Sequence, residues 1–592
     1  MTIPFYFLIL LISAFLWPAF YKVKYYKIRP YLSHTLQLIL IFSLLMHAAA
    51  NINIFWIKFI IAGAAFAFTL LLLFNALLMS ITSINLFESL KIFSIGGDFM
   101  LSMEEAGFPR FSVVAAPAGG ILLIYIGGII YSSFPNTFII PITNVEFSIL
   151  LLLLLMTFIL EQFVSKNFYE YFSRREYPLY LSLFSKGRYT LEFEIPSPPS
   201  EVQIKKIIDK VKPASNKKNI IYIVLESFRH DMVDKNICPV MNQIYSESLQ
   251  IKESYGSAIY TSLSWNTIFL DRPSWTVDSD ISSFNGESSG SVLLQIFKKA
   301  GFNIYLSASA NMHWNKFLSR INGSGLIDRS YLSYDEHKDK PRNEIDDHTV
   351  SNAITFMEEH KSKKPYLMFV HLDSSHWTYF FDKTAERFKP FPDSINMVAL
   401  KSRNYSEKVF NRYKNSATQI DNEIGKIVSY LKSSGKYDST EIVIVSDHGE
   451  GFAPGIIGHS VLTDDIKRVP IIVKLPGIKN KKINGTVSHA DIMPTLFDYA
   501  GIDIDKDFNP GTSMLSETKD GKPVLILHGS MQMADLTFDN FSVSFKTEFT
   551  RDKARLTPYR ITEKNGTEIR QDISIENLKK SLTYIIEKKY IN

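Results

Sequence analysis

The stretch EIVIVSDHGEGFAPGIIGHS, residues 441–460, decides how the rest of the chain is interpreted. It opens with the run IVIV, and an apolar run without polar alternation is typical of a strand covered on both faces in a parallel sheet. The run leads directly into Asp447 and His448, and a second histidine, His459, follows eleven residues later. A carboxylate and two imidazoles at the end of a buried strand indicate chemistry at that edge of a sheet.

Further short apolar runs alternate with segments of helical spacing from about residue 218 onward. They cover residues 219–227, 302–309, 365–372 and 469–475. The clearest helix is predicted over 405–434, because its apolar residues recur every three or four positions and Gly435 follows. Strands alternating with helices predict an α/β domain with a mostly parallel sheet sandwiched by helices, and ligands bind such sheets outside the carboxyl ends of the strands.

Polar side chains stand where three of these predicted strands end. They are Glu226 after the first, His371, Asp373 and His376 around the end of the third, and Asp447 with His448 after the opening run. Two carboxylates and an imidazole from separate strands suit a divalent cation, zinc or manganese. His376 and His459 are expected beside this set or at an additional metal site.

Each of these residues also has an ordinary structural explanation. A glutamate after a strand commonly interacts with a helix N-terminus. Asp447 alone is compatible with a turn, and His376 alone with a hydrogen-bonded core histidine. Their joint occurrence at predicted strand ends favours the metal site.

A nucleophile is expected in SAIYTSLSWNTIFL, residues 257–270. Thr261, Ser262 and Ser264 lie where a run of helical character begins, and the amides and dipole of a helix N-terminus favour an anion. A hydroxyl residue here is commonly just a helix cap. A threonine bound to a metal ion has a more acidic hydroxyl and becomes a competent nucleophile at neutral pH.

The first 161 residues predict a transmembrane domain of five spans. The apolar segments are residues 1–20, 33–50, 53–81, 115–134 and 146–161. Each is long enough, or nearly so, to cross a hydrocarbon core of about 30 Å at about 1.5 Å per residue. A buried helical core is the weaker interpretation, since helices of soluble proteins show a polar face. The first segment lacks a basic leader and a small-residue cleavage site, so we predict a span and not a signal peptide.

Two further regions follow the predicted spans. Residues 162–217 are rich in aromatic and basic residues and predict interfacial helices and a linker, punctuated by PSPPS at 196–200. Residues 218–592 form the predicted catalytic domain, whose portion 523–592 is smaller, more β-rich and closed by a helix at 575–588.

Charge and cysteine content exclude two classes of protein. The net charge of +5 is small for 592 residues and argues against nucleic acid as a partner. The single cysteine, Cys238, excludes an internal disulfide framework. Basic residues in the first predicted loop (Lys22, Lys24, Lys27 and Arg29) favour a cytoplasmic loop, which after five spans places the C-terminal domain inside as well.

Several motifs together resemble one enzyme superfamily. They are IVLESFRHDMV, the hydroxyl residue in TSLSW, VHLDSSHW, the helix with STEIVIVSDHGE after it, GHS, and SHADIMPTL. Over roughly residues 218–505 the chain resembles the sulfatase-like branch of the alkaline phosphatase superfamily. With five spans in front, it looks like the membrane-anchored lipid A phosphoethanolamine transferases and lipoteichoic acid synthases.

The resemblance implies a role for each matched residue. The positions matching metal ligands are Glu226, Thr261, Asp447 and His448. Thr261 also matches the nucleophile that becomes phosphorylated, while His376 and His459 match histidines that bind substrate phosphate or a second metal and assist the leaving group. The implied reaction moves phosphoethanolamine or phosphoglycerol from a phospholipid donor, through phosphothreonine, to an envelope lipid or glycan such as lipopolysaccharide. It also implies a cytoplasmic-membrane protein with an extracytoplasmic catalytic domain, which we adopt over the charge count because donor and acceptor meet there.

Two departures from the family patterns leave donor and acceptor open. Type I sulfatases need Cys-x-Pro-x-Arg, whereas this chain has Thr261, Leu263 and Trp265, so sulfate-ester hydrolysis is not expected. Phosphoethanolamine transferases usually carry Gly-Pro after the histidine that matches His376, whereas Trp377 follows here. A membrane-anchored phosphodiesterase or phosphatase, and a non-catalytic lipid-binding regulator on the same fold, are the alternative functions.

Overall fold

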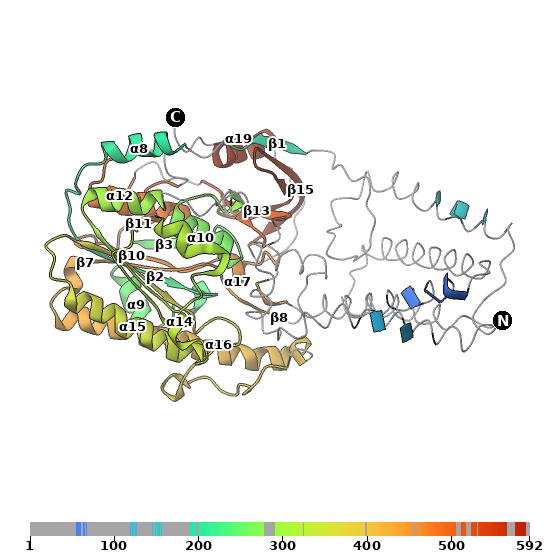
Figure 1. Ribbon diagram of the computed structural model, residues 1–592, viewed down its shortest axis with the longest axis horizontal. Coiled ribbons are helices and arrows are strands. Elements are labelled where there is room, and N and C mark those ends of the chain that lie inside the picture. Colours follow the sequence, from blue (N-terminus) through green and yellow to red (C-terminus); the bar gives the residue numbers. More distant parts are fainter. Residues whose placement is uncertain are drawn as a thin grey trace. The chain divides into compact units, whose positions relative to one another are not determined.

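The structure is a computed structural model, drawn in Figure 1. It describes most of residues 190–587, apart from 197–199, 277–289, 324, 397–398, 454–455, 460, 505–510, 517–521, 530 and 565–574, together with scattered positions between 55 and 156. The first two predicted spans lie outside the described residues, and the positions described within the other three are helical. No helix composed of described residues combines the length and the apolar composition needed to span a bilayer. The five spans stay a prediction.

A six-stranded sheet forms the centre of the compact unit that covers residues 191–592 (Figure 1). In spatial order its strands are β10 (Ile471–Lys474), β7 (Thr440–Ser446), β2 (Asn219–Leu225), β6 (Tyr366–Leu372), β4 (Asn303–Ala308) and β5 (Arg329–Leu332). Neighbouring strands are parallel except β10, which runs antiparallel to β7. The five strands predicted from apolar runs all belong to this sheet, and the prediction of a mostly parallel α/β fold is confirmed.

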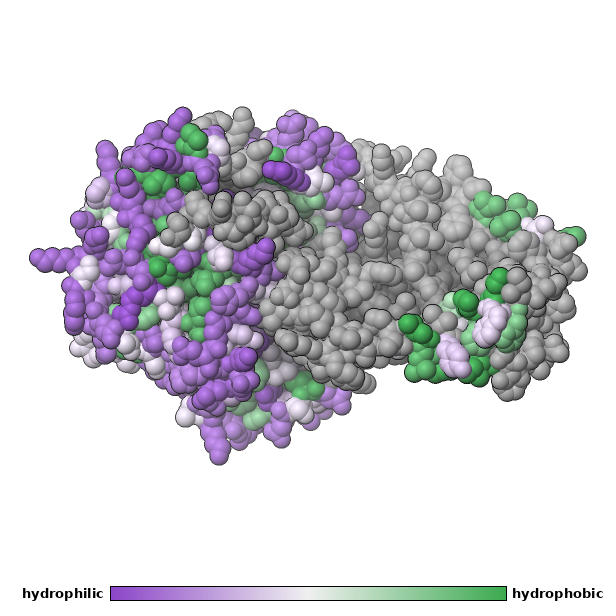
Figure 2. Space-filling view, in the orientation of Figure 1, coloured by the Kyte–Doolittle hydropathy of each residue, from purple (hydrophilic) through white to green (hydrophobic). Residues whose placement is uncertain are grey.

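Helices cover both faces because consecutive strand residues point to opposite sides. Along β2, Ile220, Tyr222 and Val224 pack with α10 (Thr261–Leu270), α12 (Val292–Ala300) and α18 (Ile492–Ala500). The alternate residues pack with α9 (Pro239–Ser246), α15 (Arg342–Glu359) and α16 (Arg403–Ser433). Helix α16 matches the predicted 405–434 closely. The face visible in Figure 2 is mostly hydrophilic over this unit, as expected when the apolar side chains fill the two cores.

Short elements connect these layers. They include helices α8 (Glu201–Lys210), α13 (Phe317–Asn322), α14 (Ser333–His337) and α17 (Asp464–Lys467). Two small ladders pair β3 (Gln250–Tyr255) with β11 (Lys482–Ser488), and β8 (Gly451–Ala453) with β9 (Ile456–Gly458).

A second, antiparallel sheet joins the first strand of the unit to four strands from its C-terminal portion. Its strands, in order, are β1 (Leu191–Glu194), β15 (Lys553–Glu563), β14 (Phe541–Phe549), β13 (Met533–Thr537) and β12 (Val524–Leu527). Helix α19 (Ile575–Ile586) packs on it through Leu578, Leu582 and Ile586, in the same apolar cluster as Leu191 and Phe193. The C-terminal portion is therefore β-rich and closed by a helix, as its sequence suggests.

Strand β1 and helix α8 precede residue 218, in the region predicted as interfacial helices and linker. Leu191 pairs with Leu556. Ile204 of α8 is buried in the core on the face of the main sheet that α10, α12 and α18 cover. The strand escapes sequence analysis because it has only four residues, LEFE, next to an aromatic and basic stretch. The described residues just before 218 thus pack into the α/β unit.

Candidate functional site

The site lies at the carboxyl ends of the central strands. Strand β2 pairs in parallel with both β6 and β7, so the residues that follow all three strands meet at one edge of the sheet. Glu226 follows β2, while Asp447 and His448 follow β7. Thr261 is the first residue of α10, whose N-terminus opens on the same edge.

The four predicted metal-site residues come together there. The Thr261 hydroxyl donates a hydrogen bond to Oε1 of Glu226 at 2.8 Å and lies 3.3 Å from Nε2 of His448. The same Nε2 atom is 3.7 Å from Glu226 Oε1 and 3.4 Å from Asp447 Oδ2. Glu226, Asp447 and His448 are buried, whereas Thr261 is half-buried.

The donor set fits a divalent cation. One ligand atom from each of Glu226, Asp447 and His448 lies within 4.8 Å of the others. The backbone N–H groups of Ser227 and His448 fix Asp447 Oδ1, at 2.9 and 2.7 Å, whereas the buried Oδ2 has no hydrogen-bond partner. Such an unsatisfied carboxylate oxygen calls for an explanation, and a bound cation supplies one.

The orientation of His448 agrees with that role. Its Nδ1 lies 2.9 Å from the carbonyl oxygen of Gly449, so Nδ1 carries the proton and donates it. Nε2 then presents a lone pair toward the carboxylates, which is the arrangement of a metal-ligating imidazole held by its other nitrogen. Oxygen and imidazole donors suit zinc or manganese.

The electrostatics of the two carboxylates differ. Burial by itself raises the pKa of Glu226, but His371, His376 and His448 around it outweigh burial and hold this pKa well below its usual range. Burial and the neighbouring charge of Glu226 raise the pKa of Asp447 well above its usual range. Two adjacent buried carboxylates resist joint ionisation unless a cation compensates them.

His376 and His459 also reach the site. The ring of His459 lies 4.2 Å from that of His448, centroid to centroid, and its buried Nδ1 has no hydrogen-bond partner. Burial lowers the pKa of His459 well below its usual range. Burial, with Arg342 nearby, lowers the pKa of His376 to about 4. Both imidazoles are therefore neutral at pH 7 in the protein alone.

His371 is a further site residue to which sequence analysis assigned no role. It is fully buried near the end of β6, with Nε2 3.7 Å from Glu226 Oε2. Neither ring nitrogen has a hydrogen-bond partner, and Trp265 packs edge-on against the ring at 5.1 Å. A histidine inside the otherwise apolar strand YLMFVHL was the available signal.

His489 fixes the geometry of the site from outside. It accepts a hydrogen bond on Nδ1 from the backbone N–H of Ser257 at 3.2 Å, and its Nε2 donates to the carbonyl oxygen of Ser446 at 2.8 Å. His489 lies in the 3-10 turn before α18. It also joins the loop before Thr261 to the end of β7.

Glycine is required where that loop passes β7. A Cβ atom on Gly256 would lie 3.0 Å from the carbonyl oxygens of Ala258 and Asp447, and 3.4 Å from Cε1 of His489. Backbone oxygens cannot move aside as a flexible side chain can. The absence of a side chain at 256 thus lets the loop before Thr261 approach the backbone of Asp447.

Hydrogen bonds also hold the loop that carries His376. Asp346 accepts from the backbone N–H groups of Asp373 and Ser374, each at 2.8 Å. Arg342 forms an ion pair with Asp373, and the Ser375 hydroxyl donates to the backbone oxygen of Glu226 at 2.5 Å. The loop is thereby tied directly to the residue that follows β2.

Comparisons with known proteins agree with this architecture. The sulfatase family model matches residues 218–502. An uncharacterized sulfatase, YidJ, from Escherichia coli is 25% identical over 234 residues, 34% of this chain and 46% of that protein. Lipoteichoic acid synthase 1 of Bacillus subtilis is 24% identical over 341 residues, 51% of this chain and 49% of that protein. The matches thus span about half the length of these curated relatives.

Among solved structures, the lipoteichoic acid synthase LtaP from Listeria monocytogenes superposes with a TM-score of 0.48 and 17% identity, covering 64% of this chain and 95% of that chain. The family match begins at β2 and ends after α18, so it contains every predicted metal-site residue. Enzymes of this superfamily depend on metal ions, in agreement with the donor set described above. The match of residues 218–502 to the sulfatase family model, with the lipoteichoic acid synthases among the relatives, supports a sulfatase-like superfamily member.

Proposed function

We propose that the protein is a metal-dependent transferase that moves a phospho-headgroup, phosphoethanolamine or phosphoglycerol, from a phospholipid to an envelope lipid or glycan. The observation that carries the proposal is the half-buried Thr261 hydroxyl, 2.8 Å from Glu226 and 3.3 Å from His448 at the N-terminus of α10. A hydroxyl held between a carboxylate and an imidazole at a helix N-terminus is placed to attack phosphorus.

The first step transfers the headgroup to the enzyme. The Thr261 oxygen forms a bond to phosphorus, and the bond from phosphorus to the diacylglycerol oxygen breaks. The Thr261 hydroxyl gives up its proton as this bond forms, and protonation of the departing oxygen restores the proton balance. The departing oxygen takes up a proton and leaves as the alcohol of diacylglycerol.

The second step transfers the headgroup to the acceptor. An acceptor hydroxyl attacks the phosphorus of phosphothreonine, and the bond to the Thr261 oxygen breaks. The acceptor proton passes to a neutral imidazole, and the low pKa of His376 leaves its ring unprotonated and able to accept it at neutral pH. Proton return to Thr261 completes the cycle.

Glu226, Thr261, Asp447 and His448 are the residues that would hold a zinc or manganese ion. When bound, such an ion acidifies the hydroxyl and stabilises negative charge on the transferring group. The protein's part is to fix the donors through backbone hydrogen bonds to Asp447 and His448. His459 and His376 are proposed to bind the substrate phosphate or a second metal ion.

The proposed donor and acceptor imply a cellular location for the protein. A phospholipid donor agrees with the apolar segments within residues 1–161, and relatives named lipoteichoic acid synthases support a headgroup transferase. We place the protein in the cytoplasmic membrane with its catalytic domain outside. A periplasmic or surface reporter fused to the C-terminus tests this orientation, and a reporter active only in the cytoplasm contradicts it.

The modified threonine tests the reaction directly. The full chain, incubated with phospholipid and zinc or manganese, should carry a phospho-headgroup adduct on Thr261 in peptide mass spectrometry. Thr261→Ala should abolish the adduct, whereas Ser262→Ala, the neighbouring hydroxyl, should keep it. An unmodified Thr261 in metal-loaded protein, or an adduct that moves with Ser262, would contradict the proposal.

A hydrolase is the second candidate, because several relatives are named sulfatases. The same phosphothreonine could pass its group to water. Both functions release diacylglycerol, but product analysis separates them: a transferase labels the acceptor, while a hydrolase frees the headgroup phosphate whether or not an acceptor is present.

A further inference from the structure

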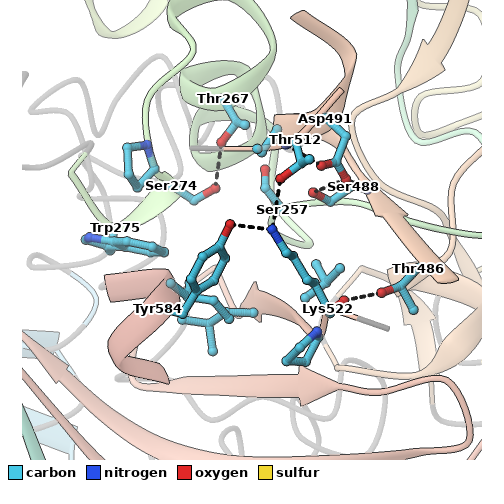
Figure 3. A pocket seen from close by; sticks show the side chains of 17 residues that line it. Ser257, Thr267, Ser274, Trp275, Thr486, Ser488, Asp491, Thr512, Lys522 and Tyr584 are labelled. Atoms are coloured by element: carbon cyan, nitrogen blue, oxygen red, sulfur yellow. Dashed lines mark hydrogen bonds between the residues drawn. The ribbon is translucent and has the colours of Figure 1, made fainter. Parts of the chain in front are cut away.

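A cavity that none of the four metal-site residues lines is found between the loop before α10 and the C-terminal helix α19 (Figure 3). Its volume is about 100 Å³. One water molecule needs only about 10–15 Å³ of such space. The cavity is therefore large enough for a small organic ligand, and no step proposed above uses it.

Hydroxyl groups dominate the polar lining of this cavity. The hydroxyl residues are Ser257, Thr267, Ser274, Thr486, Ser488, Thr512 and Tyr584. Figure 3 shows several of these side chains around a shared open space, with the Lys522 amine between Tyr584 and Thr512. Hydroxyls both donate and accept hydrogen bonds, so this lining complements a ligand that does the same.

Lys522 is held in place at the cavity. Its amine donates to the hydroxyl of Tyr584 at 2.6 Å and to that of Thr512 at 3.2 Å. The amine also lies 4.5 Å from the centre of the Tyr584 ring. An ammonium group has three N–H bonds, and the two hydroxyl groups accept two of them. The third can donate to a ligand.

Trp275 borders the cavity with its aromatic ring. The side chain is 91% buried, being 9% exposed, and its Nε1 atom has no hydrogen-bond partner. One face of the indole is stacked on Phe549, with ring centroids 5.8 Å apart and planes at 12°. In Figure 3 the indole nitrogen lies at the end of the ring that faces away from Lys522 and Tyr584, so Trp275 offers the cavity aromatic carbon surface.

The charges around the cavity favour a neutral ligand. The cation Lys522 shares the lining with Asp491, whose carboxylate accepts from the backbone N–H groups of Ser488 and Thr512 at 2.8 Å each. An anion would be attracted by the lysine and repelled by the aspartate. A ligand with many hydroxyls gains hydrogen bonds from both groups without a charge penalty, and aromatic rings suit its C–H faces.

We propose that this cavity binds a neutral polyhydroxy unit, a monosaccharide residue or a glycerol moiety. The site is distinct from the phosphoryl-transfer centre, because Thr267 and Thr261 are six residues apart on α10, about 9 Å along the helix. The cavity is nevertheless connected to that centre. Ser257 lines the cavity, and its backbone N–H donates a hydrogen bond to His489. The proposal does not depend on which group Thr261 transfers.

Ligand binding to the full chain tests the proposal. The protein is purified in a detergent without a sugar headgroup, and glucose, N-acetylglucosamine, glycerol and inorganic phosphate are titrated separately, with ligand-observed NMR and calorimetry as readouts. Trp275→Phe shrinks the aromatic surface that borders the cavity, and we expect it to weaken binding about tenfold. Lys522→Met should weaken binding by a similar factor.

Trp265→Phe is the matched control. Trp265 is also buried with an unpartnered indole nitrogen, but it packs in the core and does not line the cavity. Its substitution should leave ligand affinity within about twofold. Thermal unfolding of each variant checks that it is folded.

The outcomes separate cleanly. Binding of the hexoses but not glycerol identifies a glycan unit, and the reverse identifies a glycerol unit; either supports the proposal when Trp275→Phe weakens it. Absence of saturable binding by every neutral probe overturns it, as does preferential binding of phosphate at this cavity. Equal losses in Trp275→Phe and Trp265→Phe also overturn it, because the effect would then not belong to the cavity.

Discussion

The imidazole of His489 donates a hydrogen bond from Nε2 to the carbonyl oxygen of Ser446, 2.8 Å away and one residue before Asp447. Through its other nitrogen the same ring holds the backbone of Ser257, four residues before Thr261. One side chain therefore couples the segment that carries Thr261 to the segment that carries Asp447 and His448.

Loss of these two hydrogen bonds of His489 should impair catalysis more than metal binding. His489→Ala leaves a buried N–H and a buried carbonyl oxygen without their partner, which costs about 1–3 kcal/mol of folding stability. We expect kcat to fall by about tenfold from misplaced Thr261, while KM and bound metal per protein stay near wild type. Steady-state kinetics with metal analysis measures both. The exposed His313→Ala serves as control, and loss of the metal in His489→Ala would contradict a positioning role.

Gly256 and Gly425 provide a matched pair. A Cβ at 256 would lie 3.0 Å from two backbone oxygens, whereas a Cβ at 425, inside α16, would meet only Val240 Cγ2 at 3.5 Å. We expect Gly256→Ala to destabilise the fold and lower activity, because the nucleophile loop must shift. Gly425→Ala should be neutral or stabilising by about 0.5–1 kcal/mol, the helix preference of alanine over glycine. Denaturant unfolding and activity assays on both variants decide the comparison.

Metal affinity should depend on pH through Asp447. Burial and Glu226 raise the pKa of this carboxyl, so protons compete with the cation more strongly than at an ordinary aspartate. Affinity for zinc or manganese should therefore rise with pH across the range where Asp447 loses its proton. Competition with a chromophoric chelator at several pH values measures this slope.

Removing a ligand gives the complementary result. Asp447→Asn should weaken metal binding by at least about tenfold and flatten its pH dependence. Glu441→Gln removes a buried carboxyl from the far end of the same strand and should leave metal binding unchanged. Equal affinity in wild type and Asp447→Asn would remove Asp447 from the ligand set.

Glu441 makes stability depend on pH in the opposite sense from a salt-bridged acid. Both carboxyl oxygens are buried without hydrogen-bond partners, and burial raises the pKa of Glu441 well above its usual range. The folded state thus binds a proton that the unfolded state releases above about pH 4.3. Stability should fall as pH rises from that value until the folded-state pKa is passed.

Replacing Glu441 with an apolar residue should remove this penalty. Glu441→Met is expected to stabilise the fold by about 1–3 kcal/mol at pH 8 and by less at pH 5. Thermal unfolding at the two pH values measures the difference. The exposed Glu358→Met should show neither effect, and an equal gain for Glu441→Met at both pH values would contradict the argument.

The sequence revealed much of the fold because the informative features are local. The run IVIV before Asp447 marks a buried strand, and parallel strands bring their carboxyl ends together, so Glu226, Asp447 and His448 could be grouped before their distances were known. The 3.6-residue periodicity of α16 was equally direct.

Features that depend on distant contacts were not predictable. Strand β1 gains its partner β15 from a segment more than 350 residues away, and its four residues carry no periodic signal. The role of His489 depends on two backbone groups in separate loops. His371 looked like one more polar residue at a strand end until its unpartnered nitrogens were found beside Glu226.

The pairing of β1 with β15 determines where the chain can be truncated to obtain the α/β unit alone. An expression fragment that starts at residue 218, where the family match begins, discards Leu191 and Phe193 from an apolar cluster and leaves the long strand β15 as a bare edge. Such edges recruit other chains and drive aggregation. A stable truncated protein must therefore keep the chain from Leu191 onward.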